Sequence, residues 1–249
     1  MKIPCRICTL SAVILLSVGA GCDVQQVPVS TERGLQNAVL TEAQVNQAIA
    51  VIADVEEVAE IYCVEMLPGQ DCDFVTYVAG YDDNTVNAYQ VRGEPTIIFT
   101  RPLLAEFQNR HEIAFVYGHE AAHYILRHGA KRAARETIGG LILGGLAYSQ
   151  TSGAQNSGQV AMEWAGIGSQ VGGRIYSPEE ELEADRLGAE LAMQAGYDPA
   201  VGVLLFARFT DGTSFEVLPT HPPHHQRITA VQTHVDTLDA AFSDPDTQY

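Results

Sequence analysis

The amino-acid sequence predicts an α+β fold that is mostly helical, with a small antiparallel sheet beside one central, largely apolar helix. Three observations support this prediction. Apolar residues recur at helical spacing over long stretches in both halves of the chain. Three short segments rich in β-branched and aromatic residues lie between residues 74 and 100. The central segment, Phe115 to His128, is apolar on both flanks of a His-Glu-x-x-His pattern and contains no proline.

Length and composition indicate one folded domain. The 249 residues are 46% hydrophobic, which is enough for a sizeable core, and no internal repeat is evident. A formal net charge of −17 argues against nucleic acid as a partner, because phosphates require a basic surface. We expect a single domain over residues 37–242, followed by a flexible tail at residues 243–249.

The first 21 residues have the pattern of an export signal. A basic start precedes an apolar run from Leu10 to Val18 that is too short to span a bilayer, and small residues lead up to Cys22. Residues 1–21 resemble a bacterial lipoprotein signal peptide, which implies that Cys22 is lipidated and anchors the chain to a membrane. A plain cleaved signal and an uncleaved anchor are the alternatives. Residues 22–36 are polar and are expected to be a tether.

Cys63 and Cys72 are the two cysteines that remain once the signal and Cys22 are set aside. In an oxidising envelope we expect them to form a disulfide, which closes a loop of about ten residues and stabilises the fold by roughly 2–3 kcal/mol. A second metal site built from these two cysteines alone is not expected.

The elements ahead of the central helix follow from capping and propensity. Thr41 is expected to open a helix, with Gln44 placed for a capping box and apolar residues at helical spacing through Ile61. Thr100 or Arg101 would precede a short helix that has proline in its first turn. The expected strands, with a turn between the first two, and the short helix are Phe74–Ala79, Asn87–Val91, Thr96–Thr100 and Pro102–Asn109.

Residues 137–173 are rich in Gly, Ala and Ser, and their apolar part is too short for a transmembrane span. Small residues at Gly140 and at Gly144 or Gly145 would let two helices approach closely. The segment is therefore either a close-packed helical hairpin, a mobile lid, or a set of loosely ordered packing helices.

The C-terminal third is expected to be helical. Ser177 is an N-cap with proline at the next position, and that helix should stop at Gly196. A further helix is expected at Pro199–Phe209. A last amphipathic helix, with apolar residues from Ile228 to Phe242, follows the segment Thr220 to Pro223.

The pattern His119-Glu120-x-x-His123 points to zinc. Residues four apart share one helix face, so both imidazoles can each give a zinc ion one nitrogen ligand, while Glu120 can act as general base on a water molecule at the metal. The pattern supplies two ligands, and a catalytic zinc requires a third from elsewhere. The alternative is that both histidines are ordinary surface or core residues.

The helix that begins after Ser177 carries candidates for the third ligand. Glu181 and Asp185 are one turn apart and project from one face, which Gly188 continues. An acid on that face can orient a histidine through its free N–H, and a glycine permits close helix contact. The remaining acids are explained by the positive end of the helix dipole: Glu179, Glu180 and Glu183.

These patterns together resemble the CAAX prenyl protease and HtpX-like family of zinc endopeptidases. The His-Glu-x-x-His motif is followed some sixty residues later by Glu-x-Glu-Ala-Asp-x-x-Gly at residues 181–188, and the resemblance covers about residues 87–227. It implies a zincin-type metallopeptidase domain with one Zn²⁺ per chain. The ligands that it implies are His119, His123 and Glu181.

The resemblance also implies roles for residues around the metal. Asp185 would orient a zinc-bound histidine. His221 and Arg227 would lie at the mouth of the site as oxyanion stabiliser and carboxylate partner, or His221 would be a resting fourth ligand that blocks the metal. Family members often carry Arg where this chain has Pro178, so any contact from that arginine is absent.

The expected function is that of a zinc endopeptidase exported to the periplasmic face of a bacterial membrane. Its partners would be that membrane, through the N-terminal lipid, and protein or peptide substrates, among them misfolded or misassembled envelope proteins. The strand Thr96–Thr100 would be a sheet edge that aligns an extended substrate. The alternatives are a non-proteolytic envelope factor with a structural or latent zinc site, and a zinc hydrolase with a non-peptide substrate.

Overall fold

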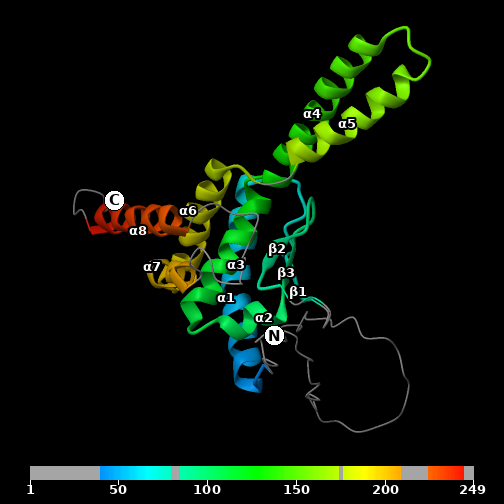
Figure 1. The fold of residues 1–249 in the computed structure, drawn as a ribbon. Helices are drawn as coiled ribbons and strands as arrows, with labels where there is room; N and C mark the ends of the chain where they lie inside the picture. Colours follow the sequence, from blue (N-terminus) through cyan, green and yellow to red (C-terminus); the bar gives the residue numbers. More distant parts are fainter. Residues whose placement is uncertain (1–39, 80–82, 84, 174–175, 209–223, 244–249) are drawn as a thin grey trace, which may run out of the picture.

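The computed structural model describes residues 40–79, 83, 85–173, 176–208 and 224–243 (Figure 1). The expected export signal and tether, with Cys22, and also His221 lie outside these residues. The expected mostly helical α+β fold is confirmed. The elements, in chain order, are α1 (Glu42–Met66), β1 (Val75–Val78), β2 (Ala88–Gln90), β3 (Thr96–Phe99), α2 (Arg101–Glu106), α3 (Arg110–Ile125), α4 (His128–Thr151), α5 (Ser157–Gly173), α6 (Pro178–Gln194), α7 (Pro199–Gly202), the 3₁₀ helix η1 (Val203–Arg208) and α8 (His224–Ser243).

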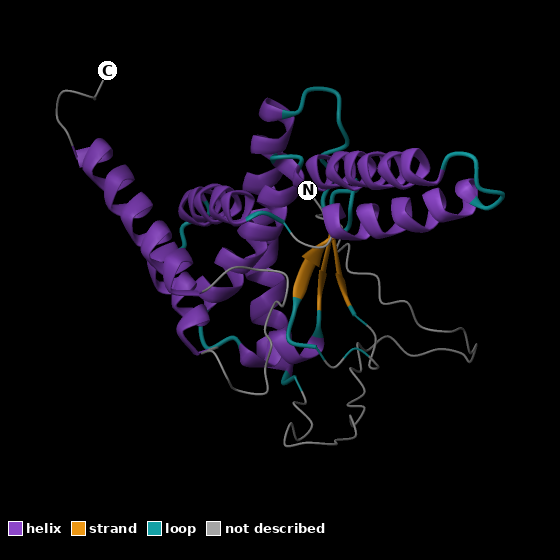
Figure 2. Cartoon of the chain, turned by 45° about the horizontal axis from the view of Figure 1, so that its top comes forward, coloured by secondary structure: helices purple, strands orange, loops and turns teal. Residues whose placement is uncertain are grey.

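Helix α3, which carries the His-Glu-x-x-His motif, is the centre of the fold. It packs against α1, α6, α7 and β2, and every residue from Glu112 to His123 is buried. Figure 2 shows the three strands beside this helical body. A helix buried on all sides has apolar residues on every face, which is why the motif has apolar flanks. Each polar side chain in it must find a partner inside the protein.

The sheet differs from the antiparallel arrangement expected. The strand order is β1-β3-β2, with β3 antiparallel to β2 and parallel to β1. The short link at residues 91–95, in which Gly93 has a φ of +83°, forms a tight hairpin that pairs β2 with β3. The other edge of β3 is then left for β1. The central position of β3 agrees with the complete burial of its residues Ile97 and Phe99.

This topology also corrects the expected substrate edge. Both edges of the strand at Thr96–Phe99 are paired, so it cannot add a peptide strand, and the expectation is wrong. Among the described residues β2 pairs with β3 alone. The backbone N–H of Gln90, on the edge of β2 away from β3, points to α3 and donates to Glu120. The edge nearest the motif is therefore that of β2.

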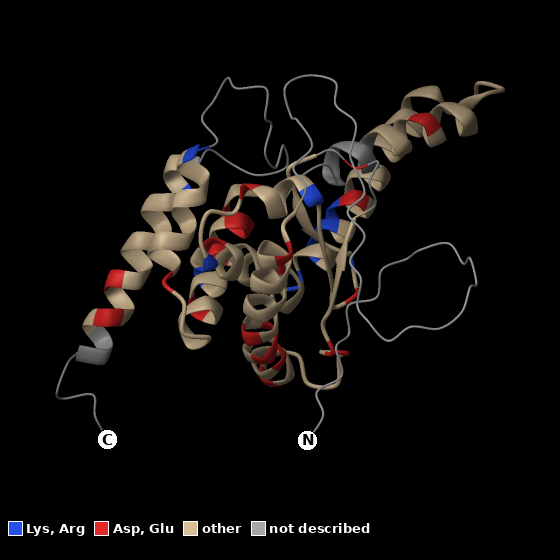
Figure 3. Cartoon of the chain, turned by 90° about the horizontal axis from the view of Figure 1, so that it is seen from below, with Lys and Arg blue, Asp and Glu red and all other residues tan. Residues whose placement is uncertain are grey.

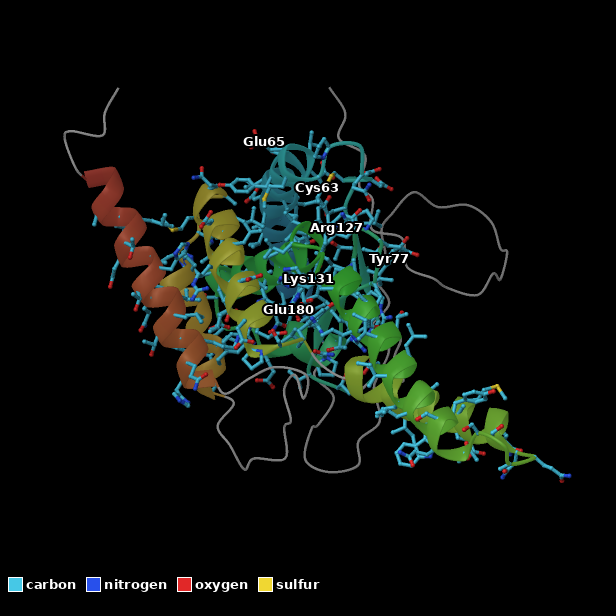
Figure 4. The ribbon with its side chains drawn as sticks, turned by 90° about the horizontal axis from the view of Figure 1, so that it is seen from above. Cys63, Glu65, Tyr77, Arg127, Lys131 and Glu180 are labelled. Atoms are coloured by element: carbon cyan, nitrogen blue, oxygen red, sulfur yellow. A yellow bond between two sulfur atoms is a disulfide. The ribbon has the colours of Figure 1, made fainter. Side chains whose placement is uncertain are left out.

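The expected disulfide joins Cys63 in the last turn of α1 to Cys72, with Cα atoms 5.7 Å apart (Figure 4). The closed loop leads directly into β1. The hydroxyl of Tyr124 in α3 donates a hydrogen bond of 2.6 Å to the carbonyl oxygen of Asp71 within this loop. The loop is therefore fixed both to the end of α1 and to the end of α3.

Residues 137–173 form a close-packed helical hairpin, one of the expected alternatives. A Cβ at Gly144 of α4 would lie 2.9 Å from the Cβ of Ala165 in α5, so the helices touch there, while one at Gly145 would meet open space. The hairpin projects from the body (Figure 1), and from residue 137 to residue 173 it has a single charged residue, Glu163 (Figure 3). Its exposed large apolar side chains are Ile138, Leu141, Ile142, Leu146, Tyr148, Met162, Trp164 and Ile167.

No helix within the described residues is long and apolar enough to cross a membrane.

The helix starts follow the expected caps. Thr41 and Ser177 each form a capping box with the residue three positions on, and Asp198 caps α7. Helix α6 ends just before Gly196, whose φ is +84°. These capping residues determine where α6 begins and ends, and therefore on which turn of the helix Glu181 lies.

The expected single helix at residues 199–209 is instead the short α7 followed by η1. At Gly202, where the two meet, a Cβ would lie 2.4 Å from the carbonyl oxygen of His111. The backbone here rests directly on α3, and the tighter 3₁₀ turns that follow bury Leu205 and Phe206. The expected last helix is present as α8.

Candidate metal centre

Three side chains from two helices converge on one point. His119 and His123 of α3 and Glu181 of α6 each offer a ligand atom, and these atoms all lie within 4.8 Å of one another. The two histidine Nε2 atoms are 3.0 Å apart, and oxygens of Glu181 lie 3.4 Å from Nε2 of His119 and 3.6 Å from Nε2 of His123. All three residues are buried. The sequence therefore correctly identified three side chains that meet in space.

This donor set fits a zinc ion. Zinc takes imidazole nitrogen and carboxylate oxygen at ~2.0–2.2 Å, and in a tetrahedral site two such atoms are roughly 3.3 Å apart. The observed separations of 3.0, 3.4 and 3.6 Å lie on both sides of that value. Three protein ligands leave a fourth position for water or substrate, which is the arrangement of catalytic zinc sites.

Two glycines let the ligand helices meet. A Cβ on Gly118 of α3 would lie 2.5 Å from the carbonyl oxygen of Gly188 in α6, and a Cβ on Gly188 would lie 2.6 Å from the backbone nitrogen of His119. The helices thus touch backbone to backbone, next to the first ligand. This close contact, expected for Gly188 from the sequence, sets the distance between Glu181 and the histidines.

Asp185 and Arg227 support His119 from behind. Asp185 Oδ1 lies 2.9 Å from Nδ1 of His119, and Arg227 binds both oxygens of Asp185 through its Nε and Nη2 atoms at 2.8 and 2.5 Å. The guanidinium also lies 4.0 Å over the ring of Phe206. Arg227 is therefore a fully buried carboxylate partner of Asp185, and of the two roles expected at an open mouth the structure supports that one.

The charged side chains around His119 favour a cation at this position. Burial and the Arg227 guanidinium lower the pKa of His119, but hydrogen bonds to Asp185 and Glu181 outweigh both and raise it to about 9. Burial raises the pKa of Asp185, and the charge of Arg227 more than offsets this, so the pKa is lowered and the carboxylate stays ionised. A divalent ion and a proton would compete for the imidazole of His119, so binding of the ion would release that proton.

Glu120 lies next to the three converging side chains with its carboxylate held in place. Its Oε2 accepts a hydrogen bond of 3.0 Å from the backbone N–H of Gln90, and its side chain is buried. Burial raises the pKa of Glu120 to about 7, although the charge of His119 opposes the shift. A carboxylate with a pKa near neutrality can both accept and return a proton at physiological pH.

Several residues of the site were not identified from the sequence. The ring of Tyr176 stacks on that of His123 with centroids 4.1 Å apart, and His128 Nδ1 lies 2.9 Å from His123 Nδ1. Glu183, attributed above to the helix dipole alone, contacts His128. Gln90 lies in the expected strand Asn87–Val91 and His128 directly follows the central helix, but no role was expected for either, and a contact made by the backbone N–H of Gln90 does not depend on its side chain.

The fold and the site together define a zincin-type metallopeptidase domain. The model of Peptidase family M48 matches residues 46–235, and the chain belongs to that family. Peptidases of this family use zinc, and the converging side chains of His119, His123 and Glu181 can bind one ion per chain.

Comparison with individual proteins gives relatives from mitochondria and bacteria. The chain is 29% identical over 216 residues to the mitochondrial metalloendopeptidase OMA1 of Bos taurus, covering 82% of this chain and 39% of that protein. It is 25% identical to the beta-barrel assembly-enhancing protease of Escherichia coli K12 and 30% identical to the putative beta-barrel assembly-enhancing protease of Vibrio cholerae, each over 158 residues that cover 59% of this chain and 32% of the relative. The chain thus spans only about a third to two fifths of the length of these relatives.

Proposed function

We propose that this protein is a zinc-dependent endopeptidase of the bacterial cell envelope. In this proposal it hydrolyses peptide bonds of misfolded or misassembled proteins, with His119, His123 and Glu181 as metal ligands and Glu120 as general base. The observation that carries the proposal is the buried Glu120 carboxylate. It lies beside the three converging side chains and is held by a hydrogen bond from the backbone N–H of Gln90, and a purely structural zinc site has no use for such a group.

The chemistry divides between the ion and the chain. Zinc, when bound, polarises the substrate carbonyl and makes water a stronger acid. Glu120 takes the proton from the attacking water and hands it to the leaving amine. The hydrogen bond from Gln90 holds the Glu120 carboxylate in one orientation while it does so. Asp185, itself held by Arg227, keeps the imidazole of His119 in the tautomer whose Nε2 would bind the metal.

The geometry suggests how a peptide is aligned. The edge of β2 that pairs with no other described strand runs beside α3 at the level of Glu120, because the Gln90 N–H on that edge reaches the carboxylate. An extended peptide added to this edge would place its backbone carbonyls beside the base. Backbone pairing makes little demand on sequence, which suits a peptidase for misfolded proteins.

The envelope location is supported by three separate features. The N-terminal sequence resembles a lipoprotein signal with Cys22 as the lipidated residue. The Cys63–Cys72 disulfide is typical of oxidising compartments. Two of the bacterial relatives are named for enhancing beta-barrel assembly. Labelling of cells with a radioactive fatty acid tests the anchor: wild-type protein should be labelled and Cys22→Ala protein should not, and equal labelling would contradict it.

Cleavage of an unfolded protein tests the activity. Zinc-loaded wild type should degrade casein, and Glu120→Gln should retain its zinc while losing about 10²- to 10⁴-fold in rate, as expected on removal of a general acid–base group. Glu179→Gln is the matched control, because Glu179 is an exposed acid in the first turn of α6. Equal cleavage by wild type and Glu120→Gln, or none by zinc-loaded wild type, would favour the non-proteolytic alternative.

A further inference from the structure

We propose that His128 and Glu183 act together as a positioning relay for the metal ligand His123. His123 Nδ1 lies 2.9 Å from His128 Nδ1, and His128 Nε2 lies 3.2 Å from Glu183 Oε2. Both imidazole side chains are fully buried. The inference rests on the metal-ligand part of the proposed function and is independent of whether the protein cleaves peptides.

The order of the protons follows from the direction of His123. Its Nε2 faces Glu181 and Nε2 of His119, the other two proposed ligands, so Nε2 is the atom that would bind the metal and Nδ1 carries the proton. That N–H donates to Nδ1 of His128, which must therefore be an acceptor. The proton of His128 is then on Nε2 and donates to the Glu183 carboxylate. One tautomer of each ring satisfies all three contacts, whereas a doubly protonated His128 would oppose two N–H groups across 2.9 Å.

The backbone between α3 and α4 produces this contact. Within one continuous helix, residues five apart point in different directions and their rings do not meet. Here Arg127 adopts the left-handed conformation, with φ 57° and ψ 34°, and this turn ends α3 and starts α4. The turn brings His128 back over the ring of His123. A non-glycine residue rarely adopts this conformation, so the turn is an unusual feature of this chain.

Neighbouring side chains hold the relay at both ends. The ring of Tyr176 stacks on that of His123 with an interplanar angle of 19°, which limits the rotation of the imidazole. Lys131 Nζ lies 3.3 Å from Glu183 Oε2, so the lysine fixes the carboxylate from the solvent side. Figure 4 shows Lys131 at the base of α4, close to the start of α6 where Glu180 is labelled.

The two histidine ligands thus have matching supports of different strength. His119 is held by the fully buried Asp185, while His123 is held through His128 by Glu183, whose side chain is 48% exposed. Solvent screens the more exposed carboxylate. Loss of the Glu183 charge should therefore weaken metal binding less than loss of the His128 ring.

Zinc affinity, measured on the full chain by competition with a chromogenic chelator, tests the relay. We expect about a 10- to 100-fold weaker zinc affinity for His128→Phe, whose ring fills the space but cannot accept the hydrogen bond from His123. His128→Gln, whose side-chain carbonyl can still accept from His123, should recover part of that loss. Glu183→Gln should bind zinc measurably more weakly than the control Glu179→Gln, an exposed acid on the same helix.

Two further measurements separate positioning from folding. The thermal midpoint of the metal-free protein should differ little between Glu183→Gln and its control, and the visible spectrum of the Co²⁺-substituted protein should change in His128→Phe because the orientation of a ligand changes. Wild-type affinity in His128→Phe, or equal affinities in Glu183→Gln and Glu179→Gln, would overturn the relay. If His128→Phe does not fold, the comparison of the two exposed acids decides alone. A wild type that bound no zinc would overturn relay and metal site together, whereas zinc-loaded protein without peptidase activity would overturn only the proteolysis.

Discussion

Gly188→Ala is the most direct test of how the fold sets the metal geometry. The added Cβ would lie 2.6 Å from the backbone nitrogen of His119 and 2.8 Å from the carbonyl carbon of Gly118. Both neighbours are backbone atoms of α3, so no side chain can rotate away. Ordinary contact begins near 3.4 Å, and the helices must therefore separate by about 0.8 Å at this point.

The size of the effect follows from that displacement. Metal–ligand distances tolerate only about ±0.2 Å, and Glu181 is on the helix that must move. Overpacking in a rigid contact costs about 1–3 kcal/mol. If this strain is expressed as misplacement of the ligands, it corresponds to a loss of about 5- to 150-fold in zinc affinity. If the helices stay in place, the same strain appears as lower stability of the metal-free protein.

Chelator competition and thermal unfolding, performed on the same samples, measure both forms of the loss. Gly145→Ala in α4 is the matched control, because its Cβ would meet open space, and the replacement should stabilise the helix by about 0.5–1 kcal/mol without changing zinc affinity. Wild-type affinity together with wild-type stability in Gly188→Ala would show that the two helices are not held in backbone contact, and would refute the reasoning.

Three further predictions concern the metal, the pH and the disulfide. Zinc at a hundred times its dissociation constant should stabilise the metal-free protein by about 2.7 kcal/mol, and a thermal midpoint that does not respond to zinc would contradict the site. Burial raises the pKa of Glu180, but hydrogen bonds from Arg135 and from the backbone of Ser177 outweigh it, so the folded-state pKa lies below the usual 4.5. The resulting stabilisation is present above pH 4.5 and is lost as the pH falls through the folded-state pKa of Glu180. Between about pH 5 and pH 3, wild type should therefore lose more stability in urea titrations than Glu180→Gln, which keeps the capping box. Equal losses of stability in the two proteins would argue against the ion pair of Glu180 with Arg135. Replacing both Cys63 and Cys72 by Ser should lower the free energy of unfolding by about 2–3 kcal/mol, measured from urea midpoints, and an unchanged midpoint would show that the open loop keeps its structure without the bond.

Features encoded by local spacing could be predicted from the sequence. The four-residue separation of His119 and His123, the cap at Ser177, and the position of Glu181 within the following helix are fixed by helix geometry alone. The convergence of the two helices also had a signal, because Gly188 continues the face of Glu181. Local spacing could therefore place His119, His123 and Glu181 as candidates, while the choice of Glu181 as third ligand came from the family resemblance.

Features that depend on the backbone path between elements could not be predicted from the sequence. The expectation of an antiparallel sheet was wrong for β1 because three short strands of similar composition leave their pairing to tertiary contacts, and the hairpin at Gly93 pairs β2 with β3. The contact of His128 with His123 depends on the left-handed backbone of Arg127, a conformation that the residue type does not announce. The hydrogen bond from Gln90 to Glu120 uses a backbone group, for which any residue type except proline would serve.

The projecting hairpin of α4 and α5 lies in the sequence between the two helices that carry the proposed metal ligands, α3 and α6. Glu181, the proposed third metal ligand, follows the histidines only after the chain has run out along α4 and returned along α5. The start of α6 is tied to α4 by the ion pair of Arg135 with Glu180. We expect insertions, deletions or exchange of the distal turns beyond this ion pair to leave the positions of His119, His123 and Glu181 unchanged. The length of the sequence between the motif and Glu181 would then be independent of the geometry of the metal centre.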